Sequence, residues 1–310
     1  MAQTIVIGTR GSQLALWQAN WVGGALRERF PDLRVELLAI KTKGDKILDV
    51  ALAKVGGKGL FVKEIEEALI SGRIDLAVHS MKDMPADIPE GLCIGAVPAR
   101  ENPLDVLITR SGGGLSTLPE GARVGTSSLR RAAQLRGRRP DLEIRTLRGN
   151  LDTRLRKLAE GDLDAIVLAA AGMLRMGLAQ HVSEYLGADV MLPAVGQGAL
   201  CIEMRRGDPR VARLAAALDD SATHTVVAGE RAFLKRLEGG CQVPIAAHGR
   251  LADGVFSLTG LVAEVDGRTV IRQTRSGTAA ASEAVGIQLA EHLLTLGARE
   301  ILDKLKSEGH

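Results

Sequence analysis

Short apolar runs alternate with longer amphipathic stretches over the first part of the chain. Apolar runs at residues 4–9, 34–40 and 74–78 predict strands, while the spacing of apolar positions over 12–30 and 60–70 predicts helices. Strands that alternate with helices in this order are typical of βαβ units and a mostly parallel sheet. The pattern therefore predicts a first α/β lobe.

A second alternating stretch begins near Glu101. Its candidate strands are residues 105–109, 123–125, 142–147 and 165–168. Its candidate helices are residues 128–136, 151–159 and 170–178. The run LPAVGQGALCIEM, from Leu192, predicts a crossing followed by one more strand that could return to the first lobe.

From about Ser221 the pattern changes to a helix, a loop, three strands and a long C-terminal helix. The helix is expected over residues 223–237, and the strands over 245–251, 255–264 and 268–274. The expected fold class is α/β, with two lobes followed by a small α+β domain that contains a three-stranded sheet. The expected boundaries are residues 1–98 with 195–217, 99–194 and 218–310.

The two predicted lobes share a short sequence echo, VIGTRGSQLA near the start and RVGTSSLRRA in the second lobe. Both runs place Gly-Thr at a strand end and Ser at a helix start. A helix N-terminus offers unpaired N–H groups and partial positive charge, so each lobe could present an anion-binding corner to a shared cleft. A chance origin of so short an echo stays open.

Charge is unevenly distributed, although the net charge of the 310 residues is only +3. Ten arginines lie between residues 123 and 156: Arg123, Arg130, Arg131, Arg136, Arg138, Arg139, Arg145, Arg148, Arg154 and Arg156. Guanidinium groups bind carboxylates through two parallel hydrogen bonds, so the cluster suits a polycarboxylate. The alternative is a solvated surface, which we expect for the three arginines that precede Pro140.

Arg130 and Arg131 fall in the first turn of a predicted helix. The helix dipole disfavours cations there, so a negative partner is required, and a polycarboxylate ligand would supply it. Aromatic residues make up only 2% of the chain. This scarcity argues against a single-stranded nucleic-acid binder, which stacks bases on aromatic rings.

The segment AVHSMKDMPADIP follows an apolar strand and places His79, Lys82 and Asp83 at the carboxyl end of the predicted sheet. Open α/β sheets bind ligands at that edge. A carboxylate in a cleft can stabilise a cation or move a proton, whereas the plainer interpretation is a turn with a surface ion pair. His79 has no second histidine at ligand spacing, so no metal site is expected.

The chain has three cysteines, Cys93, Cys201 and Cys241, without CxxC spacing, which argues against a disulfide framework or structural zinc. Cys93 and Cys201 lie in apolar stretches typical of buried thiols. Cys241 follows two glycines and precedes Pro244, so a shaped loop and a reactive thiol are expected.

The long segment KTKGDKILDVALAKVGGKGLF lies between a predicted strand and a predicted helix. Loops of this length are typical of functional lids or of flexible connections. Lys54, Lys58 and Phe61 could help to cover a cleft, and a simple linker is an equal alternative.

Seven runs together resemble the hydroxymethylbilane synthase family, also called porphobilinogen deaminase: GTRGSQLALWQ (from Gly8), AKVGGKGLFVKEIE (Ala53), DLAVHSMKDMP (Asp75), VGTSSLRRAAQL (Val124), RTLRGNLDTRLRKL (Arg145), LPAVGQGAL (Leu192) and EGGCQVP (Glu238). They occur in the family order, and beyond about Ile245 only the element pattern supports the resemblance. Gln13 stands where the family usually has proline, which is favourable but dispensable at a helix start.

The resemblance implies a chemistry. Cys241 would hold a dipyrromethane cofactor through a thioether, and Asp83 would be the principal catalytic residue. Asp83 would contact pyrrole N–H groups, assist loss of ammonia from porphobilinogen and stabilise the cationic azafulvene-like species. Four units would be joined head to tail, and hydrolysis would release linear hydroxymethylbilane while the cofactor stays attached. The implied fold has two lobes like those of periplasmic binding proteins, plus a third domain that carries the cysteine.

The resemblance also assigns residues to the acetate and propionate groups of cofactor and substrate. Those on the cofactor side are Lys82, Asp83, Thr126, Ser127, Ser128, Arg130, Arg131 and Arg148. Those on the substrate side are Arg10, Ser12, Gln18, Arg148 and Arg154. The family is usually monomeric.

The N-terminal sequence lacks a secretion signal, and no apolar run of about 18 residues appears, so a cytoplasmic protein without a membrane partner is expected. Two other functions stay open. A two-lobed protein that binds an organic anion without chemistry accounts for the lobes and arginines, but not for Cys241. A nucleic-acid binder depends on the basic stretch alone.

Overall fold

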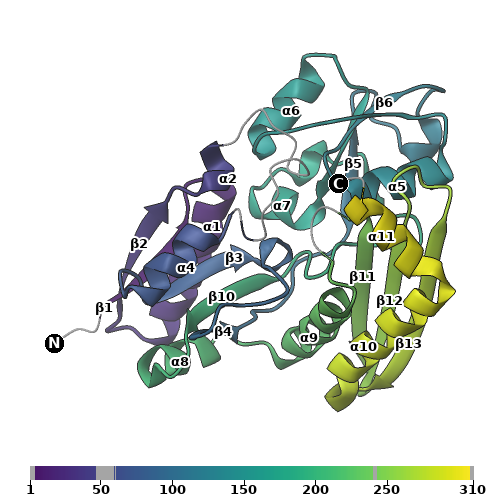
Figure 1. Ribbon diagram of the computed structural model, residues 1–310. Coiled ribbons are helices and arrows are strands. Elements are labelled where there is room, and N and C mark those ends of the chain that lie inside the picture. Colours follow the sequence, from purple (N-terminus) through teal and green to yellow (C-terminus); the bar gives the residue numbers. More distant parts are fainter. Residues whose placement is uncertain (1–3, 47–58, 60, 240–242, 308–310) are drawn as a thin grey trace. The chain divides into compact units, whose positions relative to one another are not determined.

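The computed structural model describes residues 4–46, 59, 61–239 and 243–307 (Figure 1). Contacts divide the chain into two compact units, which are described separately. Unit 1 comprises residues 1–49, 57–101 and 199–225, and unit 2 comprises residues 50–56, 102–198 and 226–310. The expected boundaries between three domains stay a prediction.

Unit 1 contains a five-stranded sheet in the order β2-β1-β3-β10-β4. Its strands are β1 (Thr4–Arg10), β2 (Arg34–Ile40), β3 (Leu76–Ser80), β4 (Leu92–Ala96) and β10 (Leu200–Arg205). β10 runs antiparallel to both neighbours, so the other four strands share one direction. The prediction that the strand after Leu192 returns to the first lobe is confirmed.

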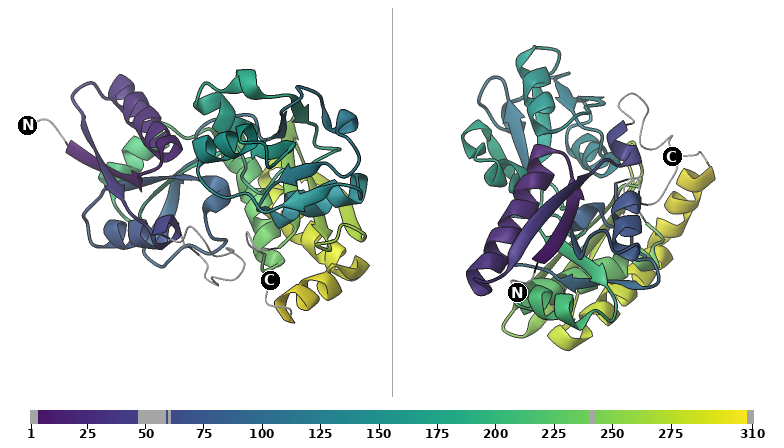
Figure 2. Two further views of the ribbon diagram at one scale, coloured as in Figure 1. Left: turned by 90° about the horizontal axis from the view of Figure 1, so that it is seen from above. Right: turned by 90° about the vertical axis from the view of Figure 1, so that its left-hand side faces the viewer.

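Helices cover both faces of this sheet (Figure 2). α1 (Gln13–Arg29) packs through Val22 and Leu26 against Ile7. α4 (Lys63–Ile70) packs on the opposite face, where Ile65 and Leu69 meet Ala77. The unit also contains α2 (Lys43–Lys46) and α8 (Pro209–Ala216). The opposite faces follow from the alternation of side chains along β1 and β3.

Unit 2 contains a second five-stranded sheet, in the order β7-β6-β8-β5-β9. Its strands are β5 (Asp105–Thr109), β6 (Arg123–Gly125), β7 (Glu143–Arg145), β8 (Ala165–Ala169) and β9 (Glu184–Leu186). β5 is antiparallel to both neighbours, as β10 is in unit 1, so β6 occupies the position that β1 has in the first sheet. The accompanying helices are α5 (Leu129–Arg138), α6 (Leu151–Ala159) and α7 (Ala170–Arg175).

The rest of unit 2 is a three-stranded antiparallel sheet covered by helices. Its elements are α9 (Ser221–Arg236, which begins in unit 1), β11 (Ile245–Ala252), β12 (Val255–Ala263), β13 (Val270–Thr278), α10 (Ser282–Leu293) and α11 (Arg299–Ser307). Phe233, Phe256 and Leu289 fill its core. Two α/β lobes and a small α+β part with a three-stranded sheet confirm the expected α/β fold class.

The expectation of one continuous C-terminal helix is wrong, because Gly297 adopts φ 106° and interrupts the helix between α10 and α11. L-residues with side chains rarely adopt that conformation, and glycine adopts it without steric cost. None of the helices in the described part of the chain is both long and apolar enough to span a membrane.

Candidate active site

The first of the two predicted anion-binding corners lies where β1 leads into α1. Ser12 is the N-cap of α1, and its hydroxyl accepts a hydrogen bond from Ala15 N at 3.4 Å. The Arg10 guanidinium pairs with the Asp45 carboxylate and lies over the Phe61 ring, 4.2 Å from its centroid. Attraction to Arg10 and hydrogen bonds from Arg10 and Thr42 outweigh the effect of burial and lower the pKa of Asp45.

Asp83 joins this corner in one pocket. β3 ends at Ser80, and the 3₁₀ turn Met81–Asp83 follows directly, which confirms the expected position after a strand of the parallel set. The pocket is lined by Arg10, Ser12, Leu14, Ala15, Gln18, Phe61, Val62, Val78, His79, Ser80 and Asp83. Buried Gln18 donates to Ser80 Oγ at 3.0 Å and so joins α1 to the end of β3. Lys82 is half-buried in the same turn, but is not part of the pocket lining.

The second corner lies where β6 leads into α5, and it repeats the first. Ser128 is the N-cap of α5 and accepts from Arg131 N at 3.4 Å. Thr126 Oγ1 accepts from Ser128 N at 3.2 Å, and Ser127 Oγ donates to Leu147 O. The sequence echo thus marks the same local structure in both sheets, a strand end followed by a serine-capped helix.

Arg130 and Arg131 are buried, with only 5% and 6% of their surface exposed. Both contact the fully buried Asp105 carboxylate at the start of β5. Arg130 donates to both Asp105 oxygens, at 2.7 and 3.1 Å, and to Leu192 O. Arg131 donates to Asp105 through Nε at 2.9 Å and pairs with it through Nη2 at 2.7 Å, and it also donates to Val167 O.

The interpretation that the ligand itself must offset these helix-start cations is therefore wrong, because Asp105 offsets them within the protein. Burial alone would raise the pKa of Asp105, but attraction to Arg130 and Arg131 outweighs it and holds the pKa well below its usual range. Two guanidinium groups against one carboxylate leave a single net positive charge at this corner.

The remaining arginines differ in their surroundings. Arg148 is half-buried in the turn before α6, and Arg154 Nε donates to Gly149 O at 2.9 Å across the same turn. The expected solvated helix end is wrong for two residues: Arg136 donates to Val265 O, and Arg139 pairs with Asp141 and donates to Leu115 O and Leu118 O. Arg138 is exposed and donates to Asp189 O.

Three residues at these corners, Asp45, Asp105 and Gln197, were not identified from the sequence. Gln197 donates to Asp105 Oδ1 at 3.1 Å and to Pro103 O at 2.7 Å, so the GQG run contributes to the buried arginine cluster. The signal for Asp105 was a lone carboxylate at the head of an apolar strand, DVLIT, whose residues are all buried. Asp45 carried no comparable signal.

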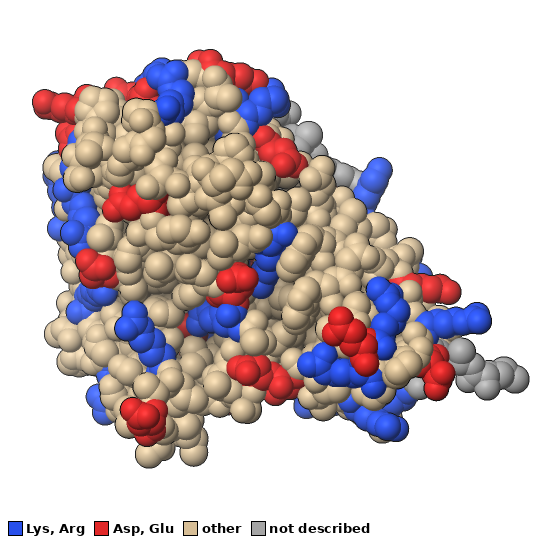
Figure 3. Space-filling model, turned by 180° about the vertical axis from the view of Figure 1, so that it is seen from behind, with Lys and Arg blue, Asp and Glu red and all other residues tan. Residues whose placement is uncertain are grey.

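Cys241, Lys54 and Lys58 lie outside the described residues. Next to that gap, a Cβ on Gly239 would lie 2.5 Å from Ile245 Cδ1, so a larger residue there would require the Ile245 side chain to shift. Cys201 is buried and Cys93 partly buried, as expected for structural thiols. The described residues contain no group of three or more His, Cys, Asp or Glu placed to hold a metal ion. On the face drawn in Figure 3, cations and anions are interspersed, and no continuous basic surface is seen.

These corners define a class of protein: a two-lobed α/β protein with serine-capped helix starts and arginines suited to a carboxylated ligand. Family profiles match residues 5–213, described as porphobilinogen deaminase, dipyromethane cofactor binding domain, and residues 224–295, described as porphobilinogen deaminase, C-terminal domain. A porphobilinogen deaminase of Syntrophotalea carbinolica is 60% identical over 96% of this chain and 95% of its own. One of Syntrophobacter fumaroxidans is 56% identical, with 98% of each chain covered.

The chain belongs to the porphobilinogen deaminase family. Similar solved structures include the methionine-binding protein MetQ, at 14% identity and TM-score 0.45, covering 74% of this chain and 94% of that one. Another is a probable amino-acid transporter extracellular-binding protein of Bacillus subtilis, at 14% identity and TM-score 0.44, covering 70% and 91%.

Proposed function

We propose that this chain is a transferase that deaminates four porphobilinogen molecules and joins them head to tail on a dipyrromethane primer attached to Cys241. Hydrolysis then releases linear hydroxymethylbilane. The observation that carries the proposal is the pocket of unit 1, in which Asp83 lies with Arg10, Ser12 and Gln18 in a chain of this family. The substrate has a positive reacting centre and negatively charged side groups. The Asp83 carboxylate can stabilise the positive centre, and the groups beside it can bind the negative side groups.

The donor set fits a polycarboxylated pyrrole. Each guanidinium has five N–H donors. Arg130 and Arg131 each use three of them in contacts within the protein. The donors not committed in this way, with the N-terminal N–H groups of α5, are suited to the carboxylates of the cofactor. Lys82, Thr126, Ser127 and Arg148 belong to the proposed cofactor site, and Arg154 to the proposed substrate site.

Asp83 acts on the aminomethyl carbon of the substrate. The C–N bond of the protonated aminomethyl group breaks with its electron pair on nitrogen and neutral ammonia leaves. The positive charge passes to the pyrrole, where the Asp83 carboxylate stabilises it. Arg10 and Ser12 hold the carboxylates of that ring, while Gln18 fixes Ser80 and the strand end from which Asp83 projects. When bound, the cofactor supplies the nucleophilic pyrrole carbon.

Intact-mass measurement tests the anchor. We expect purified protein to exceed its sequence mass by one dipyrromethane group, and Cys241→Ser to lack that excess. Cys93→Ser is the matched control and retains it. An active protein with unmodified Cys241 overturns the proposed attachment.

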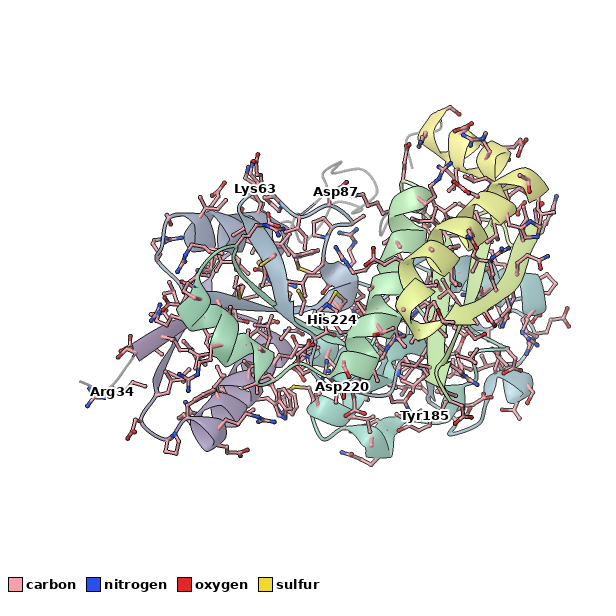
Figure 4. All side chains as sticks on the ribbon, turned by 90° about the horizontal axis from the view of Figure 1, so that it is seen from below. Arg34, Lys63, Asp87, Tyr185, Asp220 and His224 are labelled. Carbon is pink, nitrogen blue, oxygen red and sulfur yellow. The ribbon has the colours of Figure 1, made fainter. Side chains whose placement is uncertain are left out.

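Ammonia release from porphobilinogen tests the chemistry. Asp83→Asn keeps the mass excess but loses turnover by about a hundredfold or more, because a neutral amide cannot stabilise the cation. Asp87→Asn removes a carboxylate from the exposed continuation of the same loop and stays near wild type (Figure 4). Tight porphobilinogen binding without ammonia release would instead favour the binding protein without chemistry.

A further inference from the structure

Three titratable side chains are buried together beneath α4 in unit 1, and the mechanism above uses none of them. They are Glu66, His79 and Glu203, with 8%, 5% and 0% of their surface exposed. We define them as the α4 cluster. They come from three elements, α4, β3 and β10.

Strand register brings the cluster together. β3 and β10 are antiparallel, with His79 opposite Cys201 and Ala77 opposite Glu203, so His79 and Glu203 share one face of the sheet. α4 covers that face through Ile65 and Leu69, and Glu66 lies on the same buried side of the helix. His79 Nε2 and Glu203 Oε2 are 3.0 Å apart.

The hydrogen bonds of the cluster are incomplete. Glu203 Oε1 and Glu66 Oε1 are both buried and lack a hydrogen-bond partner within the described part of the chain. An ionised carboxylate in that condition is costly, so a protonated one is favoured.

Charge balance leads to the same conclusion. Two carboxylates lie beside a single imidazole in this cluster, so a proton on one carboxylate relieves the repulsion between them. Burial, and then repulsion from Glu203, raise the pKa of Glu66 to about 7, against the opposing attraction of His79. The cluster therefore changes charge near neutral pH.

Among the described residues, only His79 is recorded as opposing the rise in the pKa of Glu66. Arg205, two residues after Glu203 on β10, instead donates to Leu69 O and Ile74 O. On α4 the neighbouring charge is Glu67, which acts in the same direction as Glu203. On β10 the residue opposite His79 is the buried thiol of Cys201. On β4, Cys93 interacts electrostatically with both Glu203 and Arg206. β1 presents the apolar Val6 to the helix on this face.

The cluster reaches the pocket directly through His79, which is part of its lining, and is connected to it at two further points. Asp83 follows His79 by four residues, through the end of β3 and the 3₁₀ turn. α4 begins directly after Phe61 and Val62, which line the pocket. The Arg10 guanidinium lies over the ring of Phe61. The packing of α4 on the sheet therefore positions both walls of the pocket.

We propose that Glu66, His79 and Glu203 are positioning residues, that a proton on the buried Glu66 carboxyl keeps α4 packed on the sheet, and that loss of this proton loosens the pocket around the substrate. The claim about substrate rests on the proposed function, whereas the claim about α4 does not. The substrate-independent effect is therefore measured separately.

Amide hydrogen exchange of the full-length wild-type protein tests the packing. After correction for intrinsic exchange rates, we expect protection of residues 63–70 to fall between pH 6 and pH 9, while protection of α1, on the opposite face, stays constant. In Glu66→Gln, which is neutral at every pH, protection of α4 no longer depends on pH. Constant protection of wild-type α4 over this range overturns the proposal, whatever the variant does.

Steady-state kinetics test the link to the pocket. In wild type, KM for porphobilinogen should rise from pH 7 to pH 9. This rise should exceed the rise in Glu66→Gln by roughly threefold or more. Glu67→Gln makes the same change one residue away on the exposed side of α4 and follows wild type. If α4 loosens but the KM profiles of wild type and Glu66→Gln coincide, the positioning role is wrong. A protein that releases no ammonia contradicts the proposed function instead.

Discussion

β1 in unit 1 and β6 in unit 2 occupy the same place in two sheets of the same strand order, and each leads into a helix capped by serine. The two corners differ in how their cations are neutralised. Arg10 pairs with Asp45, and both side chains are 25% exposed. Arg130 and Arg131 are buried against Asp105, which has no exposed surface.

Under the proposed function, one scaffold therefore provides two kinds of anion site. At the first corner a ligand carboxylate can compete with Asp45 for a partly hydrated arginine, because an exposed ion pair contributes little free energy. At the second corner Asp105 is fixed in the core and stays in place. A ligand there meets a preformed arginine pair with one net positive charge.

Buried carboxylates show the same contrast. Asp105 has two guanidinium partners, and its pKa is held low despite burial. Glu66 has no guanidinium partner among its recorded interactions, and burial raises its pKa to about 7. Burial acts in the same direction on both, so the neighbouring charges decide the outcome.

The largest expected effect comes from Asp105→Asn. This change leaves two buried guanidinium groups without their carboxylate, which should lower the free energy of unfolding by about 3–5 kcal/mol. Urea denaturation measures it. Asp45→Asn is the matched control at the first corner and should cost less than about 1 kcal/mol. Equal losses for the two variants would show that the corners do not differ as described.

A smaller effect is expected from Glu66→Gln, and it depends on pH. The folded-state pKa of Glu66, about 7, lies above its unfolded value, so folded wild type binds more protons and its stability falls as pH rises toward 7. The variant lacks this loss. The free energy of unfolding of the variant, relative to that of wild type, should therefore be about 3 kcal/mol higher at pH 8 than at pH 4.

Urea denaturation of both proteins at the two pH values gives this double difference. Glu67→Gln, on the exposed side of α4, should show almost none. A double difference close to zero for Glu66→Gln would mean that the carboxyl is not held protonated in the folded protein.

Local patterns predicted most of the fold. The alternation of apolar strands and amphipathic helices located both lobes, and the echo around Ser12 and Ser128 identified two equivalent capped helices. Local sequence also placed Asp83 after a strand. These features depend on nearest neighbours along the chain, and therefore remain visible in the sequence.

The partners of the arginines could not be predicted in this way. Asp105 lies 25 residues before Arg130, and Gln197 lies 67 residues after Arg130. Only the antiparallel insertion of β5 in the sheet brings these three residues together. Arg139 looked like the end of a solvated helix, yet it binds carbonyl groups of residues 115 and 118. Long-range pairing, which no local pattern encodes, decides between a ligand-binding arginine and a structural one.

The smallest expected effect tests whether the two serine caps are equivalent. Ser12→Ala and Ser128→Ala each remove an N-cap acceptor and should each cost about 1 kcal/mol of unfolding free energy, measured by urea denaturation. Aspartate is as good an N-cap as serine, so Ser12→Asp and Ser128→Asp should restore most of that stability. The added carboxylate nevertheless repels the carboxylates of the ligand.

We therefore expect Ser12→Asp to raise KM for porphobilinogen and Ser128→Asp to reduce the fraction of protein that carries the dipyrromethane mass, although both fold as well as wild type. Ser221→Asp, at the exposed start of α9, adds the same charge to a helix start outside the proposed site and should change neither quantity. If either aspartate variant at the corners were stable and kept normal KM and cofactor content, that serine would be a helix cap alone. The anion-binding role of its corner would then belong to the neighbouring arginines.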